Sequence, residues 1–100
     1  MKNVRPRNEL LCVIQKGTLF QQKVWKEILN IPPGRTRTYK EIAIAIGHPK
    51  AYRAVGNACN RNPFPVEIPC HRVIESNGRI GGYVRGVKEK AMLLKAEKVV

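Results

Sequence analysis

The residues best suited to chemistry lie together in the segment Ile68-Pro69-Cys70-His71-Arg72-Val73. A cysteine acts as a nucleophile only as its thiolate, and a free thiol has a pKa of about 8.5, so a base or a positive charge must help to ionise it. His71 can serve as the base, and Arg72 supplies positive charge. Adjacent side chains on an extended segment point in opposite directions, so His71 would act through a water molecule or a bend in the chain. Taken alone, this pair is also typical of a buried structural cysteine beside a hydrogen-bonded histidine.

A histidine base needs a third group to orient its ring, and Glu97 is the best-placed candidate. The sequence predicts a last helix from about Val87 to Glu97, with Val87, Ala91 and Leu94 facing inward. Glu97 follows Leu94 by three residues, so it borders the apolar face of this helix. A glutamate there is either a surface charge or a group aimed inward.

Two helices joined by a short turn are predicted upstream of the cysteine. Thr38 and Glu41 have the spacing of a capping box, which satisfies free N–H groups at a helix start. Gly47 suits the left-handed position that ends a helix, and the next helix should run from about Pro49 to Asn60. The pair has the form of a helix-turn-helix. A further capping box at Thr18 predicts a preceding helix that stops before Pro32-Pro33.

The helix predicted from Pro49 to Asn60 has two distinct faces at 100° per residue. Its inner face carries the apolar residues Ala51, Ala54, Val55 and Ala58. Its outer face carries Arg53, Gly56, Asn57 and Asn60. A cation, amides and a glycine suit a helix that lies in a nucleic-acid groove with its backbone close to the partner, but they also suit an ordinary solvated face.

The fold class that these elements predict is mostly α with short strands, a winged-helix-like domain containing a helix-turn-helix. Residues 1–16 form an N-terminal segment, partly loose, in which Leu10–Ile14 reads as a short buried strand or a strand without partners. Residues 17–100 form the main domain. Val66–Ile68 is predicted as another brief strand.

Composition points toward a polyanionic partner. The chain carries 19 Lys and Arg against 7 Asp and Glu, a formal net charge of +12, with a pI of about 10.2. Charge of this size favours nucleic acid over a merely soluble basic protein. The three cysteines include no Cys-x-x-Cys spacing, which argues against a disulfide framework or a zinc site. The polar start does not read as a secretory signal, and Leu10–Ile14 is too short to span a bilayer, so we expect a cytoplasmic protein that does not enter membranes.

The segment from Asn62 to Ile74, Asn-Pro-x-Pro-x-x-Ile-Pro-Cys-His-Arg-Val-Ile, resembles the active-site signature of the O6-alkylguanine-DNA alkyltransferases, also called methylated-DNA–protein-cysteine methyltransferases. The resemblance extends in order over residues 17 to 97 and identifies the C-terminal active-site domain of that family. Further matching stretches are Phe20-Gln21-Gln22-x-Val24-Trp25, Ile31-Pro32-Pro33-Gly34, Thr38-Tyr39, Arg53-Ala54-Val55-Gly56 and Gly81-Gly82-Tyr83. Most members carry an additional N-terminal domain, of which this sequence contains almost nothing.

The resemblance implies a role for each matching residue. Cys70 would accept the alkyl group, while His71, a bound water and Glu97 would relay its proton. Asn62 would hold the turn that carries the cysteine. Tyr39 would lie near the target phosphate and protonate the leaving guanine. The resemblance further implies that Arg53 is a finger that enters the base stack, that Pro65, Val73 and Tyr83 line the base pocket, and that Lys40, His48 and Ser76 contact DNA. Gly56 and Asn57 are expected to contact DNA because they lie on the outer face of the helix.

The function implied is DNA repair by stoichiometric, irreversible transfer of an alkyl group from O6-alkylguanine in duplex DNA, with O4-alkylthymine as a second candidate lesion. The lesion atom lies inside the duplex, so the base would have to be extruded. A thioether has no easy hydrolysis route, so each protein molecule would react only once. We expect a monomer without cofactor or metal. Two alternatives stay open: an alkyltransferase-like protein, which binds the lesion without reacting but commonly replaces the cysteine by tryptophan, and a dimeric helix-turn-helix regulator without chemistry.

Overall fold

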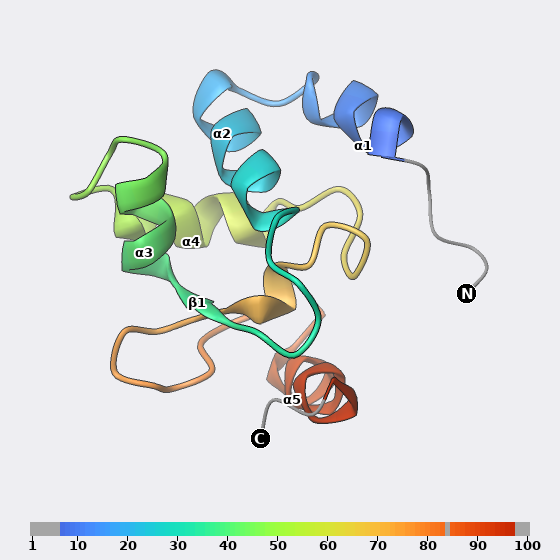
Figure 1. Ribbon diagram of the computed structural model, residues 1–100, viewed down its shortest axis with the longest axis vertical. Coiled ribbons are helices and arrows are strands. Elements are labelled where there is room, and N and C mark those ends of the chain that lie inside the picture. The colour runs from blue at the N-terminus through green and yellow to red at the C-terminus, as the bar shows by residue number, and fades with distance from the viewer. Residues whose placement is uncertain (1–6, 84, 98–100) are drawn as a thin grey trace.

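The computed structural model describes residues 7–83 and 85–97 and is built mainly of helices. In chain order its elements are α1 (Arg7–Ile14), α2 (Leu19–Ile28), β1 (Arg37–Thr38), α3 (Tyr39–Ala45), α4 (Tyr52–Asn60), the 3-10 turn η1 (Cys70–Arg72), β2 (Val73–Ile74) and α5 (Val87–Ala96) (Figure 1). This is the predicted class, mostly α with short strands, and α3 and α4 form the helix-turn-helix. No helix in the described part of the chain is long and apolar enough to cross a membrane.

Both predicted capping boxes are present. At the start of α2, the Thr18 hydroxyl accepts a hydrogen bond from the Gln21 N–H (3.1 Å), and the Gln21 side chain accepts one from the Thr18 N–H (3.0 Å). At the start of α3, Thr38 and Glu41 exchange the same bonds at 3.0 and 2.7 Å. Each cap contributes about 1 kcal/mol by satisfying donors that the first turn leaves free. The first residue of α3, Tyr39, is therefore held at a defined place.

The turn of the helix-turn-helix begins as predicted and ends later than predicted. Gly47 has φ +85°, its N–H donates to Ile44, and the His48 N–H donates to Ala43, which together satisfy the last carbonyls of α3. The chain then makes another turn, closed by a hydrogen bond from Ala51 N to His48 O (2.9 Å). The predicted helix start at Pro49 is therefore wrong, because this proline lies in the turn.

The buried face of α4 differs in part from the predicted inner face. Val55, Ala58 and Cys59 are buried, whereas Ala54, predicted on the inner face, is exposed. The predicted outer residues Arg53, Asn57 and Asn60 are exposed, and Gly56 is half-buried.

The N-terminal segment is helical where a strand was predicted. Residues Arg7–Ile14 form α1, which packs against α2. Leu10 and Ile14 are both buried, because the spacing of four residues puts them on one face of a helix. The prediction of looseness for the first residues falls on residues 1–6, outside the described part of the chain.

Residues Val66–Ile68 also depart from the predicted strand. Val66 has φ +77°, a left-handed conformation that is strained for a β-branched residue. Pro65 and Ile68 form only an isolated bridge around this turn. The segment therefore folds back on itself just before the cysteine instead of pairing along its length.

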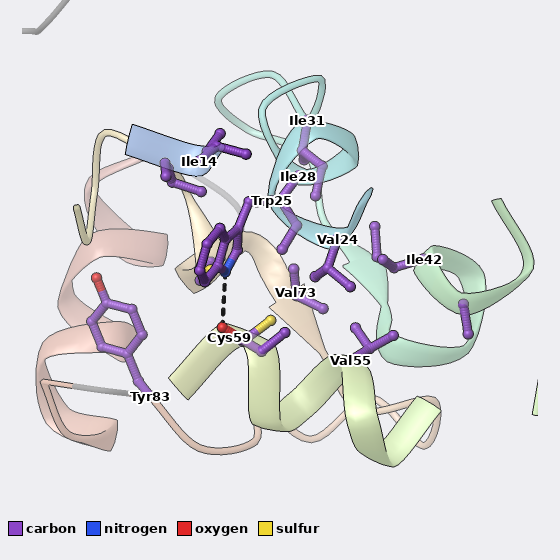
Figure 2. Close-up of a cluster of buried hydrophobic side chains, with 14 of the residues drawn as sticks. Ile14, Val24, Trp25, Ile28, Ile31, Ile42, Val55, Cys59, Val73 and Tyr83 are labelled. Carbon is purple, nitrogen blue, oxygen red and sulfur yellow. Dashed lines mark hydrogen bonds between the residues drawn. The ribbon is translucent and has the colours of Figure 1, made fainter. Parts of the chain in front are cut away.

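The core lies between α2, α3, α4 and β2. Trp25 of α2 donates a hydrogen bond from its indole N–H to the Ala58 carbonyl of α4 (2.9 Å), which joins two helices through the middle of the core (Figure 2). Ile42 of α3 and Val73 of β2 are fully buried beside them. Burial of side chains of this size stabilises the fold by roughly 1.5–3 kcal/mol each.

Strands β1 and β2 are short, but they join two segments that are far apart in the sequence. They pair in parallel, with Arg37 opposite Val73 and Thr38 opposite Ile74. Strand β1 leads directly into α3, and β2 directly follows η1. The pairing therefore brings the start of the helix-turn-helix next to the turn that carries Cys70.

Helix α5 has the predicted extent but a different buried face. Val87 is 52% exposed and Ala91 is exposed, so the prediction that they face inward is wrong. Leu94 is buried as predicted, together with Lys90. The inward face therefore carries a charged residue whose burial depends on partners elsewhere in the chain.

Candidate active site and nucleic-acid interface

Cys70 is buried at the start of η1 and is held there by Asn62. The Asn62 side-chain amide donates to the Ile68 carbonyl (2.7 Å) and to the Cys70 Sγ (3.1 Å), and its Oδ1 accepts from the Phe64 N–H (2.9 Å). One side chain thus spans the strained turn and reaches the sulfur. The cysteine does not lie on an extended segment, because Cys70–Arg72 forms a 3-10 turn.

The bend lets two consecutive side chains reach one carboxylate. His71 Nε2 lies 2.9 Å from Glu97 Oε2. Arg72 donates from Nε to Glu97 Oε1 (3.0 Å) and from Nη2 to Oε2 (2.7 Å). Glu97 follows the last residue of α5, so this network ties the end of that helix to the cysteine turn.

The charges of this network leave His71 as a neutral base. Burial works to raise the pKa of Glu97, but hydrogen bonds from Arg72 and His71 outweigh it and lower the pKa, so the carboxylate is ionised. Burial also lowers the pKa of His71, which favours the neutral ring. An ionised Glu97 accepts the proton on Nε2, so Nδ1 carries the lone pair. Nδ1 is buried and has no hydrogen-bond partner among the described residues.

Cys70 rests as a thiol. Burial raises its pKa well above the usual value, and a hydrogen bond with the Cys59 thiol adds to the effect, while Asn62 and the positive charge of Lys90 work against it. A nucleophilic thiolate must therefore form when a substrate is bound, by transfer of the proton to a nearby base.

Lys90 is a site residue that the sequence analysis missed. Its side chain is fully buried, and its Nζ donates to the Val73 carbonyl (2.6 Å) and the Gly82 carbonyl (3.0 Å). The ammonium also lies 5.7 Å from the centre of the Tyr39 ring. Burial lowers the pKa of Lys90 to about 8. The only sequence signal was its spacing of four residues from Leu94, which puts both on one helix face.

Tyr39 lies beside Lys90 and remains protonated. Burial raises its pKa well above the usual value, and the nearby Cys59, Cys70 and Glu75 add to the effect. Its hydroxyl packs against Gly81, which has φ +73° and where a Cβ would approach the hydroxyl to 3.0 Å. A glycine is required there both by the backbone and by the space that Tyr39 occupies.

Two adjoining hollows open beside Tyr39. The first, of about 240 Å³, is lined by Tyr39, Lys40, Tyr52, Glu75, Ser76 and Asn77. The second, of about 440 Å³, is lined by Tyr39, Tyr52, Arg53, Gly56, Asn57, Asn60, Glu75 and Gly82. The structure thus brings most of the predicted DNA contacts together between α3, α4 and the chain that follows β2.

Other predicted site residues lie elsewhere. His48 lines a separate hollow with residues 47–51, and its ring packs edge-on against Phe20 with the centroids 5.7 Å apart. The three residues expected to form a base pocket are not among those that line the two hollows beside Tyr39. Val73 is a core residue, Pro65 belongs to the strained turn, and Tyr83 packs edge-on against His71 at 6.3 Å.

Within residues 7–83 and 85–97, no three His, Cys, Asp or Glu side chains are close enough together to hold a metal ion. The chemistry that the described residues themselves offer is that of a buried thiol, a neutral histidine base with an ionised carboxylate behind it, and a protonated tyrosine.

Comparison with known proteins gives consistent matches. The DNA-binding-domain model of 6-O-methylguanine DNA methyltransferase matches residues 19–99. The chain is 59% identical over 88 residues to the methylated-DNA–protein-cysteine methyltransferase of Methanosarcina barkeri, covering 88% of this chain and 56% of the relative. The constitutive enzyme of that name from Bacillus subtilis is 52% identical over 90 residues, covering 89% of this chain and 54% of the relative. The chain spans about half the length of the curated relatives it matches.

Two solved structures bear on the fold. The crystal structure of Mycobacterium tuberculosis OGT in complex with DNA has a TM-score of 0.81 at 53% identity, covering 83% of this chain and 52% of that one. The structure of Schizosaccharomyces pombe Atl1 in complex with damaged DNA containing O6-carboxymethylguanine has a TM-score of 0.67 at 34% identity, covering 79% and 75%.

Proposed function

The chain belongs to the 6-O-methylguanine DNA methyltransferase family, and we propose that it repairs duplex DNA by moving an alkyl group from O6 of guanine to its own Cys70. It corresponds, in this proposal, to the C-terminal active-site domain of the longer relatives. The observation that carries the proposal is the buried Cys70 next to a neutral His71, whose ring nitrogen Nε2 is hydrogen-bonded to Glu97. A structural cysteine would need no such partners.

The proposed reaction begins with the proton of Cys70. His71 Nδ1 accepts it through a water molecule, and the Glu97 carboxylate stabilises the imidazolium that forms. The thiolate attacks the alkyl carbon, a C–S bond forms, and the C–O6 bond breaks. Guanine leaves poorly as an anion, so the Tyr39 hydroxyl supplies a proton to it. The raised pKa of Tyr39 means that the hydroxyl is protonated when the lesion binds, so a proton is present to donate, although it also makes this hydroxyl a weaker acid than a free tyrosine.

The target atom lies inside the duplex, so the base must be extruded at a cost of a few kcal/mol. Arg53, exposed on α4, would fill the gap and offset part of this cost. Lys40, Ser76 and Asn57 line the hollows where the lesion strand would pass. We retain Pro65, Val73 and Tyr83 as the base pocket, His48 and Gly56 as DNA contacts, and O4-alkylthymine as a second lesion, all as parts of the proposal.

Arg53→Ala tests the proposed finger. Because a finger acts only where a base is extruded, the variant should weaken binding to a duplex with O6-methylguanine more than binding to an undamaged duplex. Equal losses on both duplexes would reduce Arg53 to a phosphate contact. Affinity for either duplex should fall steeply with salt, since phosphate neutralisation releases counterions.

We further infer a monomeric, cytoplasmic protein that uses no cofactor. One thiol and one extruded base make up the whole proposed reaction. The proposed reaction requires Cys70 to remain a free thiol, and the reducing conditions of the cytoplasm keep thiols free.

Counting product molecules tests the function. Restored guanine should rise with protein and stop at one equivalent, because the thioether has no easy route back. Cys70→Ser should abolish the product, whereas Cys12→Ser, in an exposed position on α1, should not. Product well beyond one equivalent would exclude a stoichiometric transfer.

A second candidate function is lesion recognition without transfer. It is supported by the likeness to Atl1, whose structure is a complex with damaged DNA containing O6-carboxymethylguanine. The raised pKa of Cys70 would also suit a site that does not react. Against it stands the complete Cys70–His71–Glu97 arrangement, which a binding protein does not require. Tight binding to O6-methylguanine without restored guanine would favour this second function.

A further inference from the structure

Tyr52 is an exposed aromatic side chain that neither the core nor the proposed chemistry explains. It is the first residue of α4, next to Arg53, and is 39% exposed. The rest of the outer face of α4 is polar or small, including Gly56 and Asn57. A tyrosine ring in that place contributes little to the core and adds apolar surface to a basic face.

The ring of Tyr52 is held by a neighbour on another helix. The Nζ of Lys40, on α3, lies 5.4 Å from the centre of the ring, within the range of a cation–π interaction. This contact restrains the ring before any ligand binds. A restrained aromatic surface loses less conformational freedom on binding than a free side chain.

The position of Tyr52 relative to Tyr39 indicates which part of a DNA duplex it would meet. Tyr52 and Tyr39 are both in the lining of each of the two hollows. Under the proposed function, Tyr39 faces the phosphate of the extruded nucleotide. Tyr52 would therefore face the same strand, close to the place that the extruded base has left.

We propose that Tyr52 stacks on the base that neighbours the extruded guanine on the lesion strand. The inference rests on the proposed function, since it requires that the guanine leaves the duplex. Extrusion uncovers one face of the neighbouring base, and an aromatic ring recovers the lost stacking with little dependence on sequence. Arg53 fills the part of the gap that faces the unpaired base of the opposite strand, and Tyr52 covers the neighbouring base on the lesion strand. Lys40 keeps the ring in place and can still neutralise phosphate.

Binding measurements with three substitutions test the stacking. They are made with Cys70→Ser protein, so that no reaction consumes the lesion, on duplexes with and without O6-methylguanine. Tyr52→Ala and Tyr52→Leu should weaken binding to the damaged duplex about 5- to 150-fold, the range of one base–aromatic stack. Tyr52→Phe keeps the ring and should stay within about twofold of the parent, because stacking does not use the hydroxyl.

Fluorescence of 2-aminopurine locates the contact. The analogue is placed next to O6-methylguanine on the lesion strand, and in a second duplex at the matching place on the opposite strand. On the lesion strand, the Tyr52→Ala complex should fluoresce more brightly than the Tyr52→Phe complex, because stacking quenches the analogue. On the opposite strand, the two complexes should agree.

Several results would overturn the proposal. Unchanged affinity in Tyr52→Ala shows that the ring makes no stack, and a Phe variant as weak as Ala shows that the hydroxyl makes the contact. Equal losses on both duplexes, or a signal confined to the opposite strand, place Tyr52 elsewhere on the DNA. Alkyl transfer by protein with native Cys70 is measured in parallel. Failure of that transfer rejects the proposed function, while the binding and fluorescence results still decide the role of Tyr52.

Discussion

Lys90 carries a buried charge, so replacing it by methionine should change how the stability of the protein depends on pH. Methionine is similar to lysine in length and fits apolar positions, but it has no charge and cannot donate a hydrogen bond. Burial lowers the pKa of Lys90 to about 8 from the ordinary value of 10.5. Between these two values the unfolded chain holds a proton that the folded protein has released.

The difference between the folded and the ordinary pKa of Lys90 corresponds to a free energy of about 3 kcal/mol. Because the unfolded state binds more protons in this range, the free energy of unfolding rises with pH. The contribution is complete above a pH of about 10.5 and is lost as the pH falls toward 8. The stability of the parent relative to Lys90→Met should therefore increase by about 3 kcal/mol across this window.

Urea unfolding at a series of pH values measures this difference. Trp25 is the only tryptophan and is 4% exposed, so its fluorescence reports the loss of the core. Both proteins carry Cys70→Ser, because the charge of Lys90 and the ionisation of the Cys70 thiol influence each other. Lys88→Met is the matched control, since Lys88 is exposed on the same helix and its replacement removes one positive charge without changing a buried position.

A flat difference between the parent and Lys90→Met would refute the reasoning, because it would mean that Lys90 keeps its ordinary pKa in the folded protein. The same charge favours the thiolate of Cys70. With the native cysteine present, Lys90→Met should therefore raise the pKa of Cys70 and slow alkyl transfer at neutral pH. Lys90→Arg should retain more activity than Lys90→Met only if the charge itself matters.

Two further changes probe the site. Glu97→Gln should slow alkyl transfer and raise the pKa of Cys70 while DNA binding stays nearly constant. The thiol pKa is read from the pH dependence of thiol alkylation in protein whose other cysteines are replaced by serine. An unshifted thiol pKa would mean that Glu97 forms only a structural ion pair. Gly81→Ala should destabilise the protein by about 1–2 kcal/mol, because an alanine is strained at φ +73°, and should also displace Tyr39 and slow transfer. Gly82→Ala is its control, since a Cβ there has no neighbour within 4 Å, and urea midpoints that fall equally in both variants would contradict this account.

The features that the sequence predicts correctly depend on local chemistry. The capping boxes at Thr18 and Thr38 need only a hydroxyl and a carboxylate or amide three residues apart. The end of α3 at Gly47 needs only a residue that tolerates a positive φ. These signals are complete within a few residues, so no knowledge of the distant chain is required.

The wrong predictions concern segments whose state is decided by distant partners. Leu10–Ile14 is a continuous apolar run, which suits a buried strand or a helix equally well. Packing against α2 decides for the helix α1. Strands β1 and β2 have two residues each, too short for an alternating pattern, and only their mutual pairing defines them.

The sequence named candidate site residues but could not give the contacts between them. The resemblance marked Cys70, His71 and Glu97, whereas the direct contact of Glu97 with both His71 and Arg72 depends on the 3-10 turn at the cysteine. Lys90 was missed because lysine is almost never fully buried. Only the carbonyls that receive its hydrogen bonds explain its position, and they belong to residues that are distant in the sequence.

Intact-mass measurement after incubation with duplex DNA containing O6-methylguanine tests the central claim most directly. The protein should gain the mass of one methyl group in place of one hydrogen, with the DNA lesion in excess. Peptide mapping should put the methyl on the peptide that contains Cys70, and Cys70→Ser protein should gain nothing. An unchanged mass for a protein that binds the lesion tightly, or a methyl on Cys12 or Cys59, would contradict the account.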